Sequence, residues 1–183
     1  MGPFRKSKKR SYRRPSDILQ ARILWVETLP KGPTEALNKL SFTLNIETTD
    51  TSPQRGMLLN RFEEPCSKIK SITHNPVTLY NHQTNDHDNV SNQELKRPGF
   101  VGSYISFYNI WSDTDGKMMT KTRRTFTNRK GYFTCHEMLD NIVRFEAFDR
   151  PKSKWFGGVD CHHVYFQGIH LNKDSTYSIS WGS

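Results

Sequence analysis

The residues with the clearest chemistry are the cations near the start of the chain. Seven lysines and arginines lie within residues 5–14, and residues 1–15 contain no aspartate or glutamate. Closely spaced cations can neutralise several phosphates and release their counterions, which requires neither a folded structure nor specific base contacts. The same composition is typical of a nuclear import signal. We therefore predict that nucleic acid is bound by Arg5, Lys6, Lys8, Lys9, Arg10, Arg13 and Arg14.

The rest of the chain is almost neutral. The sequence has 27 basic and 18 acidic residues, and the first fifteen positions hold seven of the basic ones. This leaves 20 basic residues against 18 acidic ones, so most of the formal charge of +9 belongs to the N-terminal segment. That segment also lacks apolar periodicity, and we predict residues 1–16 to be a disordered basic arm. A polyanionic partner is favoured, and a solvated tail without a partner is the alternative.

A second basic cluster lies within residues 117–130, which contain six cations and no acidic residue. In a strand, Lys121 and Arg123 point to one face, whereas Arg124 points to the other face together with Phe126. We assign Lys121, Arg123 and Arg124 as a further nucleic-acid-binding surface. The alternative is that these cations are simply the solvated face of a hairpin.

The sequence does not favour metal binding or catalysis. Its three cysteines, Cys66, Cys135 and Cys161, are too few and too scattered to form a disulfide framework. The adjacent His162 and His163 point to opposite faces of a strand, and no Cys or His pair has the spacing of a zinc site. Nucleophile-elbow, P-loop and glycine-rich nucleotide motifs are absent from the sequence. We therefore predict no metal, no cofactor and no enzymatic activity.

Hydrophobic periodicity predicts that residues 17–183 form a single β-rich domain. The clearest strand spans residues 40–46, where apolar residues alternate strictly with polar ones. Residues 100–113 and 117–128 are predicted to pair as a hairpin, and residues 29–33 and 83–98 to be a turn and the longest loop. The other predicted strands are residues 21–28, 67–73, 77–82, 159–171 and 176–182, and the last two are predicted to form a second hairpin around a turn at residues 172–175.

One helix is predicted to follow Thr134. Thr134 and Glu137 have the spacing of a capping box, and Pro151 marks the end of the segment. A single apolar stripe follows the cap, formed by Cys135, Met138, Leu139, Ile142 and Val143. Since strands and helices do not alternate, we predict an antiparallel sandwich of jelly-roll type with one helix near the C-terminal third. The alternative is an α+β fold with a single sheet flanked by helices.

The order of a short basic arm and a β-rich domain of about 165 residues resembles the coat proteins of small plant and satellite viruses. This resemblance implies a jelly roll that self-assembles into a shell and an arm that holds genomic RNA or DNA. It also implies a homo-oligomer located in the virion and in the host cytoplasm or nucleus, with a nuclear import receptor as an additional partner of the arm.

Two other classes of protein remain open. The α+β alternative resembles the small basic matrix proteins of rhabdoviruses, which implies a protein that bridges a nucleocapsid and a membrane. The third class is a non-structural regulator that binds nucleic acid, such as a silencing suppressor or a nuclear shuttle. The strand order distinguishes a two-sheet jelly roll from a single sheet with helices.

Overall fold

The structure is a computed structural model that describes residues 32–49, 69–81, 86–112, 119–152 and 161–183. The described part is mainly β, with antiparallel sheets and three α-helices. The basic arm and the strand predicted at residues 21–28 lie outside the described residues. The helices are α2 (Pro33–Leu37), α4 (Asn92–Leu95) and α5 (Cys135–Asp149), and α5 continues into a short 3-10 helix, η1 (Arg150–Lys152).

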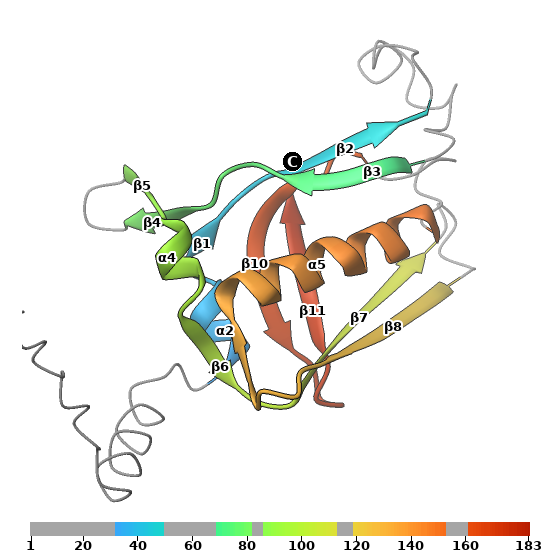
Figure 1. The fold of residues 1–183 in the computed structure, drawn as a ribbon. Helices are drawn as coiled ribbons and strands as arrows, with labels where there is room; N and C mark the ends of the chain where they lie inside the picture. Colours follow the sequence, from blue (N-terminus) through green and yellow to red (C-terminus); the bar gives the residue numbers. More distant parts are fainter. Residues whose placement is uncertain (1–31, 50–68, 82–85, 113–118, 153–160) are drawn as a thin grey trace, which may run out of the picture.

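The four-stranded sheet that carries the basic cluster is formed by the longest strands of the described chain. Its order is β10 (Tyr165–Leu171), β11 (Tyr177–Gly182), β7 (Tyr104–Ser112) and β8 (Met119–Thr127), so that β8 lies at one end (Figure 1). β7 with β8 and β10 with β11 pair antiparallel, which confirms both predicted hairpins. The central contact between β11 and β7 is parallel.

Shorter strands extend this sheet beyond β10. Thr43 forms an antiparallel bridge with Tyr165, and the N–H groups of Leu44 and Phe166 donate to the carbonyls of Val164 and Phe42 at 3.0 Å. The chain on either side of Thr43 then pairs with later strands. β1 (Leu40–Ser41) pairs with β4 (Thr78–Asn81), and β2 (Leu44–Thr48) pairs with β3 (Ile69–His74). The remaining strands are β5 (Asp86–Asn89), β6 (Pro98–Val101) and β9 (Tyr132–Thr134).

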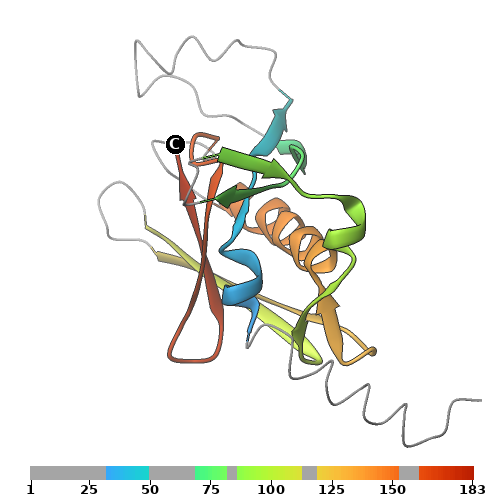
Figure 2. The ribbon, with the colours of Figure 1, turned by 90° about the vertical axis from the view of Figure 1, so that its left-hand side faces the viewer.

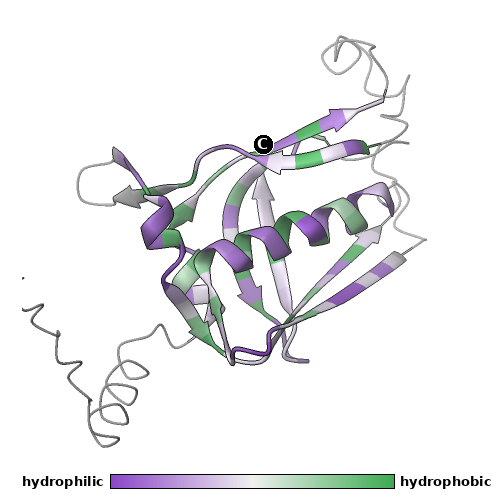
Figure 3. Cartoon of the chain, in the orientation of Figure 1, coloured by the Kyte–Doolittle hydropathy of each residue, from purple (hydrophilic) through white to green (hydrophobic). Residues whose placement is uncertain are grey.

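Helix α5 covers one face of the four-stranded sheet (Figures 1 and 2). The predicted capping box is present: the Glu137 N–H donates to Thr134 Oγ1 at 3.1 Å, and the Thr134 N–H donates to Glu137 Oε2 at 2.9 Å. The apolar side of the helix packs on the sheet, while its other side carries hydrophilic residues (Figure 3). The core contains Leu37, Phe42, Leu44, Ile105, Phe107, Met138, Leu139, Ile142, Phe145, Phe166 and Ile169.

The structure confirms the mainly β prediction but does not confirm a jelly-roll sandwich. A jelly roll buries its core between two facing sheets. Here the four-stranded sheet packs its inner face on α5, and the parallel contact between β11 and β7 interrupts the antiparallel order. The strict alternation at residues 40–46 is confirmed, since Leu40, Phe42 and Leu44 are buried.

The single strand predicted at residues 100–113 is wrong, because the chain breaks at Gly102 into β6 and β7. The Gly102 N–H donates to the Gly131 carbonyl, so β6 turns away to pair with β9 while β7 pairs with β8. A Cβ atom on Gly102 would lie 2.3 Å from the Phe100 ring, so this close approach requires glycine.

Two predicted irregular segments contain regular structure. The segment predicted as the longest loop, residues 83–98, contains β5, which pairs with β4, and α4, which begins with a capping box between Ser91 and Glu94. The turn predicted at residues 29–33 ends where α2 begins, with Pro33 in the first helical position. In both cases elements of four or five residues are too short to produce a clear hydrophobic period.

A buried ionic cluster fastens the end of α5 to the sheet. Glu146, Asp149 and Arg150 are at most 2% exposed. Asp149 Oδ2 accepts from Asn109 Nδ2 at 2.6 Å and from Trp111 Nε1 at 2.8 Å, both on β7. Its other oxygen, Oδ1, has no hydrogen-bond partner within the described ranges.

Arg150 is the cation of this cluster. Its Nε donates to Glu146 Oε2, its Nη2 donates to the His163 carbonyl, and its guanidinium lies 5.3 Å from the Trp181 ring. Burial raises the pKa of Glu146, and the charge of Arg150 opposes that rise. Buried Glu146 therefore depends on the buried guanidinium of Arg150, since removing one partner leaves an uncompensated charge in the core.

We predict that Arg150→Met destabilises the protein strongly. The substitution keeps an apolar side chain of similar length but leaves Glu146 without its cation, so we expect the free energy of unfolding to fall by about 3–5 kcal/mol. Urea denaturation measures the change. The control Arg129→Met, at an exposed position after β8, is expected to stay within about 0.5 kcal/mol of the unsubstituted protein. Equal stability of the two variants would contradict the prediction.

The cap of α5 makes stability depend on pH. Burial raises the pKa of Glu137, but hydrogen bonds from Lys130 and the Thr134 N–H outweigh this, so the pKa lies below its ordinary value of 4.5. Ionised Glu137 therefore stabilises the folded state above its unfolded-state pKa, and this contribution is lost as the pH falls through the folded-state value.

We predict that Glu137→Gln lowers the free energy of unfolding by about 0.5–1 kcal/mol at neutral pH. Glutamine keeps the hydrogen bond of the capping box and removes only the charge. The difference from the unsubstituted protein is expected to shrink as the pH falls from 4.5 through the lower folded-state pKa of Glu137, below which Glu137 is neutral like the glutamine. Urea titrations at about pH 7 and about pH 3 measure it, and a difference that grows in acid would contradict the prediction.

Candidate nucleic-acid interface

Strand β8 displays the second basic cluster on both of its faces. The nine residues of β8 pair with β7 along their whole length, with Arg123 opposite Tyr108 and Lys121 opposite Ile110. Lys121 and Arg123 are exposed, whereas Thr122 and Phe126 are buried toward α5. The predicted separation of Arg124 from the other two cations is therefore confirmed. We call the sheet face opposite α5 the outer face.

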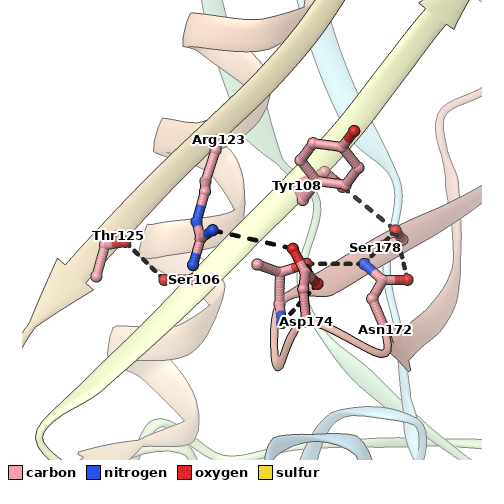
Figure 4. A network of polar contacts seen from close by, with 8 residues as sticks. Ser106, Tyr108, Arg123, Thr125, Asn172, Asp174 and Ser178 are labelled. Carbon is pink, nitrogen blue, oxygen red and sulfur yellow. Dashed lines mark hydrogen bonds and ion pairs between the residues drawn. The ribbon is translucent and has the colours of Figure 1, made fainter.

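On the outer face, Arg123 lies beside the turn that joins β10 to β11 (Figure 4). Its Nη1 is 3.9 Å from Asp174 Oδ2, and both side chains are more than half exposed. The hydroxyl and N–H of Thr176 donate to Asp174 Oδ1 at 2.6 and 3.2 Å. The hydrogen bond from the Thr176 hydroxyl is the main reason that the pKa of Asp174 is lowered. Asp174 thus stays ionised and partly neutralises Arg123.

Polar side chains anchor that turn to β7. Asn172 Nδ2 donates to Thr176 Oγ1 at 3.0 Å and to Ser178 Oγ at 2.9 Å, and the Ser178 hydroxyl donates to the Tyr108 carbonyl at 3.3 Å (Figure 4). Lys121, in contrast, forms no ion pair with the described residues. The outer face thus presents Lys121, which forms no ion pair with the described residues, and Arg123, which Asp174 partly neutralises and which lies opposite Tyr108.

On the inner side of β8, Arg124 enters a group of cations and phenylalanines. Its guanidinium lies 5.3 Å from the Phe126 ring and 5.1 Å from the Phe148 ring, and its Nη1 donates to the Arg144 carbonyl at 3.2 Å. The Arg144 guanidinium lies 5.4 Å from Phe126, and Lys152 Nζ lies 3.3 Å from Phe148. We call Arg124, Phe126, Arg144, Phe148 and Lys152 the Arg–Phe cluster.

The Arg–Phe cluster brings together three positive charges, those of Arg124, Arg144 and Lys152. None of its cations forms an ion pair with a carboxylate in the described ranges. The aromatic faces attract the cations and limit their motion, at about 0.5–1 kcal/mol for each exposed contact. Phe148 is itself 41% exposed, which is unusual for a phenylalanine and places an apolar surface among these charges.

Sequence reasoning assigned only one member of the Arg–Phe cluster as a site residue, Arg124. It missed Arg144, Phe148 and Lys152, which recur every fourth residue at the end of α5 and in η1. Side chains four residues apart share one side of a helix, so this spacing was a readable signal. The three assigned cations of β8 do not form one surface, because Lys121 and Arg123 lie on the outer face and Arg124 lies in the Arg–Phe cluster.

Four other features of the sequence bear on function: the basic arm, possible metal ligands, the cysteines and possible membrane-spanning helices. The seven cations of the basic arm lie outside the described residues. Within the described ranges, no three His, Cys, Asp or Glu side chains are grouped to hold a metal ion. Cys135 lies partly buried at the start of α5, where burial raises the pKa of its thiol. No helix of the described ranges is long and apolar enough to cross a membrane.

Comparison with known proteins identifies no relative: no family model, no curated protein and no solved structure matches this chain. The functional conclusion therefore depends on the placement of charge and on the fold.

We predict that Lys121→Gln together with Arg123→Gln weakens the salt dependence of RNA binding. Each phosphate contact to a single strand contributes about 0.7 to the slope of log K against log salt, so the slope is expected to become shallower by about 1. Fluorescence anisotropy with an oligouridylate of about 20 nucleotides measures it. The matched control replaces Lys39 and Lys96, exposed in the turns after α2 and α4, and is expected to leave the slope unchanged. Equal slopes in the two double variants would contradict the prediction.

Proposed function

We propose that the protein is a viral structural protein that binds genomic nucleic acid without sequence specificity through its basic arm. The observation that carries this proposal is the distribution of charge. Seven of the nine net positive charges lie within residues 5–14, and the body is nearly neutral. Such an arm neutralises phosphates by counterion release, whatever the sequence of the nucleic acid. Lys121 and Arg123 on the outer face of β8 would add a fixed basic surface.

The fold favours the matrix type of structural protein over the coat type. The hypothesis of a coat protein requires a jelly roll, in which two sheets face each other across the core. The described strands form four sheets, and α5 packs both on the four-stranded sheet and on β3, which agrees better with an α+β fold than with two facing sheets. That arrangement supports a protein that bridges a nucleocapsid and a membrane. Since one fold can serve many functions, the assembly itself has to be measured.

We predict that deletion of residues 1–15 weakens RNA binding by at least about 100-fold at about 0.15 M salt. The expected cause is the loss of seven phosphate contacts, so binding should also lose most of its salt dependence. Two full-length controls separate charge from length: the seven cations replaced by glutamine should behave like the deletion, and a scrambled arm of the same composition should bind normally. Unchanged binding after deletion would contradict the proposed role of the arm.

The same preparations distinguish the matrix type from its alternatives. Flotation with phosphatidylserine vesicles, compared with neutral vesicles, is expected to show binding that depends on anionic lipid. Electron micrographs of the protein with RNA are expected to show extended arrays. Closed particles formed without lipid would instead support the coat type. A strict monomer at high concentration that binds neither RNA nor vesicles would overturn the proposal of a structural protein.

A further inference from the structure

The outward edge of β8 is the longest unpaired strand edge in the described structure. β8 ends the four-stranded sheet, and its pairing with β7 runs from Met119 to Thr127. No described strand pairs with its other edge. Alternate residues of such an end strand direct their N–H and C=O groups away from the sheet, and an extended peptide can continue the ladder there.

Positive charge flanks this edge on both sides. Lys121 and Arg123 stand on the outer face, and the Arg–Phe cluster brings Arg144 and Lys152 beside Arg124 on the inner side. Only Arg123 has an acidic neighbour among the described residues, Asp174 at 3.9 Å. A strand added to this edge would therefore place alternate side chains beside cations on each face. Carboxylates at those positions would relieve the repulsion among the cations of the cluster.

The charge of the edge also decides which occupant fits. Pairing β8 with the same strand of a second copy would place lysines and arginines against one another, which is destabilising. Basic residues on end strands are known to prevent such association between copies, yet they attract a strand of opposite charge. Nucleic acid has no peptide groups to continue the ladder. Its bases also have limited access to Phe148, because Lys152 Nζ already lies 3.3 Å from the ring centroid.

We propose that the edge of β8 binds an extended acidic segment of a partner protein. The segment adds to the sheet as a fifth strand, and its carboxylates pair with Arg124, Arg144 and Lys152. This inference is independent of the proposed function, because it uses neither the basic arm nor the outer face as its main contact. The partner is defined by its chemistry: several acidic residues in a segment long enough to cover the nine residues of β8.

A synthetic peptide tests the backbone part of the proposal. The probe is a labelled peptide with capped ends that alternates glutamate with threonine, about as long as β8, and anisotropy measures its binding to the full chain. Two derivatives carry N-methyl groups on alternate residues, each blocking one of the two strand edges. The derivative blocked on the binding edge is expected to bind at least about 10-fold more weakly, and the other like the parent. Equal binding of both derivatives would overturn strand addition.

Charge variants test the other part. The double variant Arg124→Glu with Arg144→Glu is expected to weaken peptide binding at least about 10-fold. It is expected to leave RNA affinity within about twofold, because the arm provides most of the RNA binding. If the double variant fails to fold, Arg144→Glu alone, at an exposed position of α5, is expected to weaken peptide binding about threefold. Lys121→Gln with Arg123→Gln is the matched control, and it is expected to change RNA binding more than peptide binding.

Three results would overturn the proposal. The first is equal binding of a peptide with lysine in place of glutamate, which would exclude recognition of acidic side chains. The second is a loss of RNA affinity in Arg144→Glu as large as the loss for the peptide, which would make the Arg–Phe cluster a nucleic-acid site. The third is unchanged peptide affinity in every charge variant. None of these results bears on the deletion of residues 1–15, so the two proposals fail or stand separately.

Discussion

The guanidinium of Arg150 holds together the region where three parts of the fold meet. It pairs with Glu146 on α5, donates to the carbonyl of His163 just before β10, and lies over the Trp181 ring of β11. The neighbouring Asp149 accepts from Asn109 and Trp111 on β7. Each of these groups is costly to bury alone, so the cluster is stable only when all three parts are in place.

The candidate interface depends on the same contacts. The last turns of α5 bury Glu146 and Asp149 on one side and present Arg144 and Phe148 on the other. When the buried side is fastened to β7 and β11, the exposed side is held beside β8, where Arg124 reaches both Phe126 and Phe148. A core interaction thus positions a surface cluster of which only Phe126 belongs to the core.

The sheet divides the charged residues of β8 between two surfaces of different character. The outer face carries Lys121 and Arg123 close to polar side chains of the turn after β10, and is open to a ligand that needs only charge. The inner side carries Arg124 among rings and cations that have no counter-charge among the described residues. We therefore propose that a nucleic acid and an acidic peptide bind the same strand through different faces.

Several features could be predicted from sequence because they depend on residues close together in the chain. Thr134 and Glu137 cap α5 as their spacing indicates, the alternation around Phe42 buries the expected side chains, and both hairpins pair as expected. The separation of Arg124 from Lys121 also followed from the period of a strand. The surplus of charge in residues 1–15 is likewise a property of the sequence alone.

The tertiary structure decided what depends on residues far apart. The parallel contact of Tyr177 with Phe107 and the bridge of Thr43 with Tyr165 leave no local pattern, yet they decide which strands are neighbours. Gly102 breaks a continuous apolar run only because Phe100 packs against it. By itself the sequence determined most of the longer strands, the helix α5 and where the charge lies. Only packing brought Arg144, Phe148 and Lys152 beside Arg124, because side-chain neighbours across a fold are chosen by burial rather than by spacing along the chain.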